Sequence, residues 1–416
     1  MDEFKAGFDS SNLKQGDVVL YKSPNSMESI RAQIINIFES GQCYIHFIGY
    51  NRRYDLTVDR SALTFVEHAP NAANGPPHRG RRKKHSELEL RLWTIDEIQK
   101  YEVQCIRNIE VIEFKEYFIR AWYPSPYPVE YINNRKIFIC DTCLKYFSSR
   151  THLNLHLAKP HKHSFPPGYE IYRDSIDENT QISVFEIEGA KNTMFCQCLC
   201  LLGRLFLEDK AVFYDVTQFT FYVMAKYEFK LDLDTNSSNP NDSNNNSNQN
   251  SNEIKMSIVG FYSLDKYTSD NIIACIVVFP QYQRDGFGKT LISLAYTIAK
   301  RKNIRGGPES PLSDLGSIAF KSYWRDSILD FIHNYGTDDT DSDRISEATF
   351  ISHADVHETL KGLDLLIKVQ KGRPATIDRQ GAEILYEQYK RQMHFINEEN
   401  LIWLPHQTKQ KKHPTE

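Results

Sequence analysis

The chain has 416 residues, and its 50 basic and 54 acidic side chains leave a net charge of −4. A chain of this length can bury a large core in two or three domains. The charge balance excludes a polycation, so any affinity for nucleic acid has to come from local patches. No apolar run approaches the roughly 18 residues that span a bilayer, and the N-terminus lacks the apolar region of a secretory signal, so we expect an intracellular protein with no membrane contact.

The first segment, residues 12–66, contains short runs in which apolar and polar residues alternate, separated by turn residues: V-V-L-Y, A-Q-I-I-N-I and Y-I-H-F-I-G-Y. This pattern predicts a small β-barrel. Residues 67–88 are rich in Pro, Gly and Asn and include R-G-R-R-K-K-H, which indicates a flexible basic linker. A nuclear-import signal or a weak nucleic-acid contact is one interpretation of the basic cluster, and a merely solvated linker is the other.

A metal-binding pattern follows in the next segment. Cys140, Cys143, His156 and His161 have the spacing C-x2-C-x12-H-x4-H, which fits a tetrahedral Zn²⁺ site with two thiolates and two imidazoles. With eight cysteines in the chain, this C-x-x-C indicates reduced thiols and metal rather than disulfides. His161 has the best spacing for the fourth ligand, although His152 and His163 are close. A structural zinc clip is favoured over a nucleic-acid-reading finger because the finger is single and lies between strand-like segments.

The rest of the chain predicts a mixed domain. A helix is expected at residues 194–207, strands around 213–227, and mainly helical segments at 312–335, 345–365 and 383–393, the last ending in a small winged-helix-like unit. Residues 233–253 are dominated by Asn and Ser, which cannot bury a core, and we expect a disordered insertion there. The cysteines of C-x-C-x-C, at 196, 198 and 200, fit a buried helix better than a second metal site.

The most informative stretch is residues 271–289. A continuous apolar strand is expected at 272–279, stopped by Pro280, and a helix at 289–302. Between them, Gly286 and Gly288 let the backbone close around phosphate oxygens at a helix N-terminus. Alone, this pattern is equally compatible with a structural turn. It matches neither the dinucleotide fingerprint nor the P-loop, and Q-x-x-R-x-G-x-G-K instead resembles the acetyl-CoA loop of acetyltransferases.

Several further stretches, in the same order along the chain, resemble the MYST family of histone acetyltransferases. They are R-N-I-E-V-I-E (107–113), W-Y-P-S-P-Y-P (122–128), C-D-T-C-L-K-Y-F (140–147), P-P-G-Y-E-I-Y-R (166–173), C-Q-C-L-C-L-L-G-R-L-F-L-E-D-K (196–210), Y-D-V (214–216), A-C-I (274–276), G-P-E-S-P-L-S-D-L-G (307–316) and N-L-I-W-L-P (400–405). F-I-G-Y-N-R-R-Y-D (47–55) is similar to the chromo-barrel that precedes the catalytic domain in one branch, which acetylates mainly histone H4 tails within large chromatin complexes.

The resemblance implies an α/β (α+β) acetyltransferase core of the GNAT-like type with an embedded zinc finger, a helical C-terminal part and a small N-terminal β-barrel of the chromo-barrel (Tudor-knot) type. The implied acetyltransferase domain covers residues 89–408, with the zinc finger at about 131–163, the acetyl-CoA core at about 190–310 and the helical part at 311–408. It also implies a nuclear protein that works on histone tails and nucleosomes in a multi-subunit chromatin complex.

The resemblance also assigns residues. It makes Glu309 the general base, Cys275 the active-site cysteine and Lys210 a lysine that becomes autoacetylated. The implied acetyl-CoA contacts are Ile276, Val277, Val278, Gln283, Arg284, Asp285, Gly286, Phe287, Gly288, Lys289, Ser313 and Ser322. Two departures stand out: the family usually closes its zinc site with a cysteine where this chain has His161, and Asp55-Leu56-Thr57 replaces the family's Asp-Glu-Trp, which argues against a methyl-lysine cage.

The chemistry gives independent reasons for a base. A free lysine has a pKa near 10.4, so its amine cannot attack a thioester at neutral pH until a base removes a proton. Glu309 lies in a Gly-Pro-Glu-Ser-Pro loop that can hold it, partly buried, at the end of the central sheet. Cys275 lies in an apolar strand and is either a small hydrophobe or an acyl acceptor in a two-step transfer. We favour direct attack, with the acyl-cysteine route open.

Two other functions remain as alternatives at this point. The chain could be a chromatin-binding scaffold with a degenerate catalytic domain, but a scaffold has no need to keep Glu309, Cys275 and residues 283–289 together. It could also acetylate proteins other than histones, and the barrel and basic linker argue only against small-molecule amines. The acetylated lysine and the complex that the protein joins are not determined by these patterns.

Overall fold

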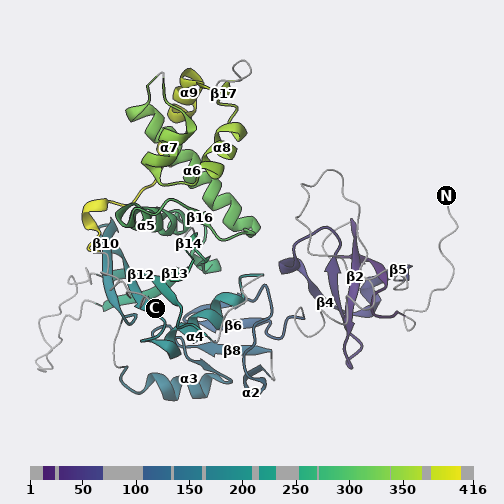
Figure 1. The fold of residues 1–416 in the computed structure, drawn as a ribbon. Helices are drawn as coiled ribbons and strands as arrows, with labels where there is room; N and C mark the ends of the chain where they lie inside the picture. The colour runs from purple at the N-terminus through teal and green to yellow at the C-terminus, as the bar shows by residue number, and fades with distance from the viewer. Residues whose placement is uncertain are drawn as a thin grey trace, which may run out of the picture. The chain divides into compact units, whose positions relative to one another are not determined.

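The computed structural model describes residues 13–23, 28–68, 106–132, 135–161, 165–208, 215–230, 253–268, 271–337, 339–367 and 376–403 (Figure 1). These residues form two compact units. The first consists of residues up to 138 together with 147–150 and 204–209, and the second consists of 139–146, 151–203 and the remainder of the chain. Among the described residues, no helix is both long and apolar enough to cross a membrane. The expected linker at 67–88 lies outside the described residues from residue 69 onward, and the expected insertion at 233–253 lies outside them except for Glu253.

The first unit begins with an antiparallel five-stranded sheet in the order β4-β3-β2-β1-β5. The strands are β1 (Val18–Lys22), β2 (Ser29–Ile37), β3 (Cys43–Phe47), β4 (Leu56–Val58) and β5 (Leu63–Glu67), with short 3-10 turns η2 (Arg52–Tyr54) and η3 (Arg60–Ala62). Their alternating apolar residues, including Val19, Ile34 and Ile45, pack into one buried core. The expected strands are therefore present, and closure into a barrel remains a prediction because β4 and β5 are the ends of this sheet.

Arg107 is the largest fully buried side chain of this unit. Its guanidinium donates to the carbonyl oxygens of Ala121, at 3.0 Å, and of Asp55. The Asp55 carboxylate is itself buried, where burial raises its pKa, and its Oδ1 lies 2.8 Å from Nδ1 of His46. A buried charge is tolerated only with such partners. Asp55, which directly precedes the departures from the family at Leu56 and Thr57, is thus part of a buried polar cluster.

A four-stranded sheet in the order β7-β6-β8-β9 comes next. It consists of β6 (Val111–Phe114), β7 (Tyr117–Arg120), β8 (Lys136–Ile139) and β9 (Tyr146–Phe147), with the short helix α2 (Val129–Ile132) before β8 and α3 (Arg150–Leu157) after β9. The turn between β8 and β9 carries the C-x-x-C pair. Strand, turn, strand and helix are the local order that brings a cysteine pair and helical histidines together.

The second unit is built on an antiparallel sheet in the order β10-β11-β12-β13-β15. Its strands are β10 (Tyr169–Asp177), β11 (Thr180–Glu188), β12 (Phe219–Lys230), β13 (Glu253–Asp265) and β15 (Cys275–Val278). Helix α4 (Thr193–Arg204) lies on one side of the sheet and α5 (Phe287–Lys302) on the other (Figure 1). All three cysteines of the C-x-C-x-C run are buried in α4, as expected for a helix enclosed in the core.

The apolar run at 272–279 is not the single strand that the sequence predicted. It divides at Ala274 into β14 (Asn271–Ile273), which pairs in parallel with β16 (Gly307–Pro308), and β15, which pairs antiparallel with β13. A short 3-10 turn, η4 (Pro280–Tyr282), follows. An apolar run indicates burial but not which neighbour each half pairs with, so the change of partner could not be predicted. The division leaves β15 at the edge of its sheet.

The C-terminal part contains α6 (Asp314–Tyr335), α7 (Ser342–Thr349), α8 (His353–Gly362) and α9 (Arg379–Tyr389), with a two-stranded sheet of β17 (Leu366–Ile367) and β18 (Thr376–Ile377). The predicted helix at 345–365 is two helices, because Phe350 has φ +60° and caps α7, and Ser352 caps α8. Such a residue ends a helix. The winged-helix-like description remains a prediction.

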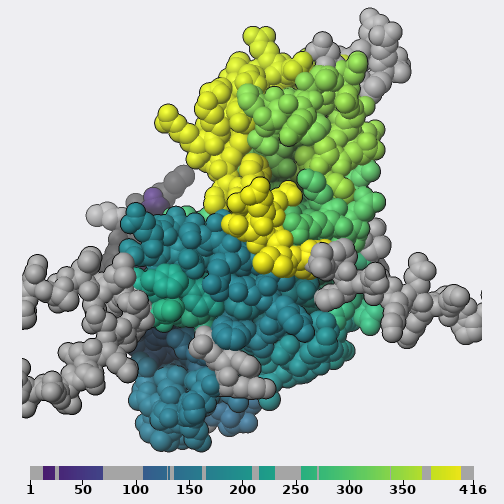
Figure 2. Space-filling view, turned by 90° about the vertical axis from the view of Figure 1, so that its left-hand side faces the viewer, coloured from purple at the N-terminus to yellow at the C-terminus, as the bar shows by residue number. Residues whose placement is uncertain are grey.

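The last described residues lie against the first strand of the central sheet. Turns η5 (Lys390–Gln392) and η6 (Glu398–Asn400) lead to Leu401, which forms a bridge with Tyr172 of β10. Arg301 of α5 donates to the carbonyl oxygens of Leu401, Trp403 and Glu398 at 2.9 to 3.1 Å. Figure 2 shows these yellow residues lying over the teal strands. Residues far apart in the sequence are thereby joined within one unit.

Gly260 of β13 controls the spacing between β13 and β15. A Cβ there would lie 2.3 Å from the carbonyl oxygen of Val277 and 2.9 Å from Cα of Val278. Both are backbone atoms, so Gly260→Ala should force the strands apart and lower the free energy of unfolding by about 1–3 kcal/mol. Urea unfolding measures this. Gly362→Ala is the matched control, because a Cβ at Gly362 meets no atom within 4 Å; equal stability of the two variants would contradict the prediction.

Candidate functional site

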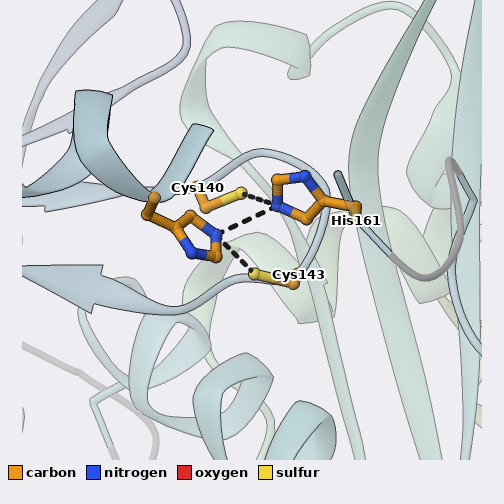
Figure 3. A group of neighbouring side chains, drawn as sticks. Cys140, Cys143 and His161 are labelled. Atoms are coloured by element: carbon orange, nitrogen blue, oxygen red, sulfur yellow. Dashed lines mark hydrogen bonds between the residues drawn. The ribbon is translucent and has the colours of Figure 1, made fainter. Parts of the chain in front are cut away.

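The four predicted zinc ligands form one cluster. Their donor atoms all lie within 4.8 Å of one another. The Sγ of Cys140 is 3.2 Å from Nε2 of His161, the Sγ of Cys143 is 3.2 Å from Nε2 of His156, and the two Nε2 atoms are 3.0 Å apart (Figure 3). Around a tetrahedral Zn²⁺, an N and an S or a second N are separated by roughly 3.3–3.6 Å. The donor set and its spacing therefore fit one zinc ion.

The electrostatics of the pair also suit a metal. The hydrogen bond between the two thiols lowers the pKa of Cys143 to about 7 and raises that of Cys140 to about 12, where burial adds to the rise. A thiolate is the form that binds metal. Of the other two histidines considered for the fourth position, His152 lies outside the cluster on an exposed part of α3, and His163 lies outside the described residues.

The predicted acetyl-CoA loop starts at an open sheet edge. In the described part of the chain, β15 pairs only with β13, so one side of Ile276, Val277 and Val278 faces no other strand. The side-chain amide of Gln283 donates to the carbonyl oxygen of Val278 at 2.8 Å, which ties the turn back to the strand. Backbone groups of an unpaired edge can bind the amide and thioester groups of a ligand.

The glycine turn provides space at a helix start. Gly286 caps α5 with φ +86°, a conformation that favours glycine, and a Cβ there would meet no atom within 4 Å. At Gly288 a Cβ would meet only the Val278 side chain, at 3.7 Å. The backbone N–H groups of the first turn of α5 have no partner within the helix. Arg284 and Asp285 are exposed beside this turn and Phe287 is buried beneath it. The geometry fits a cradle for phosphate groups.

Lys289, which was expected to contact the cofactor, has its ammonium bonded within the protein. Its Nζ lies 2.6 Å from Oδ2 of Asp326 and 3.1 Å from the carbonyl oxygen of Gln392. Ser313 caps α6 and accepts a hydrogen bond from the N–H of Gly316 at 3.1 Å. Ser322 lies one turn before Arg325, whose Nη2 is 3.4 Å from the serine Oγ.

Glu309 and Cys275 are brought together by β14. The backbone N–H of Glu309 donates to the carbonyl oxygen of Ile273 at 2.9 Å, two residues before Cys275. The Glu309 side chain is exposed, so the expectation of partial burial was wrong. Cys275 is half-exposed at the start of β15, and Oγ of Ser263 donates to its Sγ at 3.2 Å. A carboxylate and a thiol thus lie on adjoining backbone segments next to the open edge.

Sequence reasoning missed several residues of this region. Asp326 on α6 pairs with Lys289, Arg325 pairs with Asp326, and Ser263 on β13 contacts Cys275. Ser263 could have been found only from strand register. Asp326 had a sequence signal, since it lies among apolar helix residues that face the core, where a carboxylate needs a cationic partner. Lys210, the predicted modified lysine, lies outside the described residues.

Two family models match the chain. Residues 165–239 and 244–401 match the model of the MOZ/SAS family, and residues 106–159 match the MYST family zinc finger domain. The first match contains the candidate active site, and the second contains three of the four clustered candidate zinc ligands, with His161 just beyond its end.

Named relatives are histone acetyltransferases. The chain is 37% identical over 262 residues to histone acetyltransferase KAT6A of Homo sapiens, 63% of this chain and 12% of that protein. It is 34% identical over 308 residues to histone acetyltransferase ESA1 of Eremothecium gossypii, which covers 73% of this chain and 63% of that protein. It is 35% identical over 309 residues to histone acetyltransferase mst1 of Schizosaccharomyces pombe, which covers 74% of this chain and 60% of that protein. The aligned part is thus less than two thirds of each relative. On the evidence of the matched family models, this chain belongs to the MOZ/SAS family and carries the MYST family zinc finger, with a Cys/His cluster that fits structural zinc.

Proposed function

We propose that this protein is a histone lysine acetyltransferase that transfers the acetyl group of acetyl-CoA to lysine side chains of histone tails, with histone H4 as the expected tail. The observation that carries the proposal is the junction at Ala274. There the strand that carries Cys275 and the open backbone edge adjoins the segment that carries Glu309, through the bond from Glu309 N–H to Ile273 O. The family membership and the names of the relatives support the same activity.

The proposed mechanism assigns one role to each segment. The first turn of α5, with its unbonded N–H groups and the open space at Gly286, holds the pyrophosphate. The free edge of β15 aligns the pantetheine arm and holds the thioester, whose carbonyl oxygen gains charge during attack. The reacting carbonyl is thereby placed at the start of β15, next to the segment that carries Glu309.

Glu309 then makes the incoming amine reactive. Its carboxylate takes a proton from the lysine ammonium, the freed lone pair forms a bond to the carbonyl carbon, and the C–S bond breaks. Coenzyme A leaves as the thiolate, which takes up the second proton that the nitrogen loses as the amide forms. An exposed carboxylate suits this role because the lysine arrives on another protein. Cys275 stands where it can contact the thioester, and Ser263 holds its Sγ through a hydrogen bond. We assign Cys275 a packing and orienting role in direct transfer rather than a covalent one.

The cellular setting follows from the activity. We propose that the protein acts in the nucleus on nucleosomes, as part of a multi-subunit chromatin complex that regulates transcription. The N-terminal sheet is proposed to be a chromo-barrel, residues 12–66, and the acetyltransferase domain to span residues 89–408. The basic linker at 67–88 adds a weak nucleic-acid contact, and autoacetylation is proposed at Lys210. The helical residues 311–408 are proposed to end in a winged-helix-like unit.

The test uses the full chain with labelled acetyl-CoA and intact nucleosomes, followed by mapping of the acetylated lysines. We expect label on lysines of a histone tail, with H4 labelled ahead of the other histones. The Glu309→Gln variant is the matched control and measures the label that histones acquire without the proposed general base. Absence of label on every histone, with a folded and zinc-loaded protein, would refute the proposal and favour a scaffold, whereas label only on added non-histone proteins would redirect it to another protein substrate.

A further inference from the structure

A buried carboxylate lies behind the acetyl-CoA loop and has no role in the function proposed above. Asp326 of α6 is fully buried, and two partly exposed cationic side chains, Lys289 and Arg325, contact it. Its Oδ2 accepts from Nζ of Lys289 at 2.6 Å, and its Oδ1 accepts from Nε and Nη2 of Arg325 at 2.8 and 2.6 Å. A buried carboxylate without such partners would be strongly destabilising. The three side chains therefore form one unit with a net positive charge.

This cluster connects two parts of the predicted cofactor site. Lys289 closes the Q-Y-Q-R-D-G-F-G-K motif and lies in the first turn of α5. The second part is Ser322 of α6, whose Oγ lies 3.4 Å from Nη2 of Arg325. The resemblance to the family implied both as acetyl-CoA contacts. Asp326 and Arg325, to which no role was assigned, join them.

The C-terminal helices complete the cluster. The ring of Tyr389, at the end of α9, lies 3.7 Å from Cζ of Arg325, a cation–π distance. The carbonyl oxygen of Gln392 in η5 accepts the second hydrogen bond of Lys289. Helix α6 lies between α5 and α9 in the second unit and packs against both (Figure 1). The helix start that forms the cradle is thus held by a segment about a hundred residues away.

We propose that Asp326 is a positioning residue for acetyl-CoA, acting through Lys289. By holding the Lys289 ammonium, it fixes the first turn of α5 and hence the N–H groups beside Gly286 and Gly288. It also keeps Lys289 and Arg325 together, so that the surplus positive charge of the cluster lies behind the place where phosphate groups bind. Positive charge near such a site strengthens the binding of phosphate groups. The inference rests on the proposed use of acetyl-CoA.

The experiment measures acetyl-CoA binding to the full chain by calorimetry, without histone. Asp326→Asn should weaken binding about tenfold, the equivalent of one charge-assisted hydrogen bond. Lys289→Met should weaken it by a similar factor. In the double variant the two losses should not multiply, because Asp326 acts through Lys289. In turnover assays the loss should raise KM for acetyl-CoA with kcat nearly unchanged, and Asp326→Glu should restore part of the affinity.

Controls separate a positioning role from a structural one. Lys321→Met removes a cation from the exposed side of α6, where its ammonium lies 3.9 Å from Glu358, and should bind as wild type does. Should Asp326→Asn fail to fold, Arg325→Met and Tyr389→Leu disturb the same cluster from its rim and should each weaken binding. Wild-type affinity for acetyl-CoA in all folded cluster variants would overturn the positioning role of Asp326 but not the proposed function. The same holds if the losses of affinity at Asp326 and Lys289 multiply fully in the double variant. A wild-type chain that does not bind acetyl-CoA would overturn the proposed function with it.

Discussion

Replacing Glu309 by Gln is expected to lower kcat for histone acetylation at neutral pH by about 10²-fold or more, the contribution of a positioned general base. The substituted amide keeps the shape of the side chain but cannot accept the lysine proton. Because Glu309 is exposed and held through its backbone N–H, the fold and the affinity for acetyl-CoA should be unchanged. Initial rates at saturating acetyl-CoA measure the effect.

The pH dependence sharpens this result. A free lysine has a pKa near 10.4, so the fraction of substrate that is already neutral rises with pH. The deficit of Glu309→Gln should therefore narrow as the pH is raised from 7 toward about 10, where less deprotonation is needed from the enzyme. A deficit that stays constant across this range would argue that Glu309 does not act as the base.

Cys275→Ser is the matched comparison for the covalent route. Serine keeps a small polar group beside Ser263 Oγ but is a poor acyl acceptor without a base to activate it. Under direct transfer the variant should retain a substantial part of the wild-type rate when acetyl-CoA is saturating. A folded Cys275→Ser protein with no measurable turnover would establish the acyl-cysteine route in place of direct attack.

Removal of zinc is expected to have the largest effect on stability. Loss of a structural metal belongs to the few changes that cost more than about 4 kcal/mol. His161→Ala should lower the zinc content well below one ion per chain and should lower the midpoint of urea unfolding, because the cluster of Cys140, Cys143 and His156 then lacks its fourth donor. Zinc content by elemental analysis, measured together with unfolding, provides the test.

Two further variants, one at residue 161 and one at residue 152, make the test specific for His161. His161→Cys should retain one zinc, since it creates the three-cysteine, one-histidine ligand set that structural zinc sites also use. His152→Ala should also retain it, because His152 lies outside the cluster. Full zinc content in His161→Ala, or its loss in His152→Ala, would show that the fourth ligand is not His161.

Much of this architecture was predictable from local patterns. The metal site followed from C-x2-C-x12-H-x4-H, because ligand spacing within one short segment leaves few ways to arrange the donors, and the four residues do form one cluster. Helix α5 was expected at 289–302 and occupies Phe287–Lys302, because its apolar residues recur at helical spacing. The family followed from motifs spread over most of the chain, and the matched models confirm it.

The failures have a common physical origin. The apolar run at 272–279 has buried residues in both halves, but burial does not reveal that β14 pairs with β16 while β15 pairs with β13. Nor does composition reveal that Glu309 is exposed, since its surroundings come from segments distant in sequence. The helix break at Phe350 depends on a single residue with positive φ, and the spacing of apolar residues does not specify such a residue.

By itself, the sequence predicted the four donors that cluster in the structure, the helix that follows the glycine turn, and the family, because each depends on short motifs of residues close together in the chain. Only the tertiary structure decided that Glu309 adjoins Cys275 through Ile273, that the expected cofactor strand divides and leaves an open edge, and that Lys289 is held by Asp326. These contacts join segments separated by tens of residues. Pairing of strands and pairing of buried charges across such distances is decided by which arrangement satisfies every buried group at once.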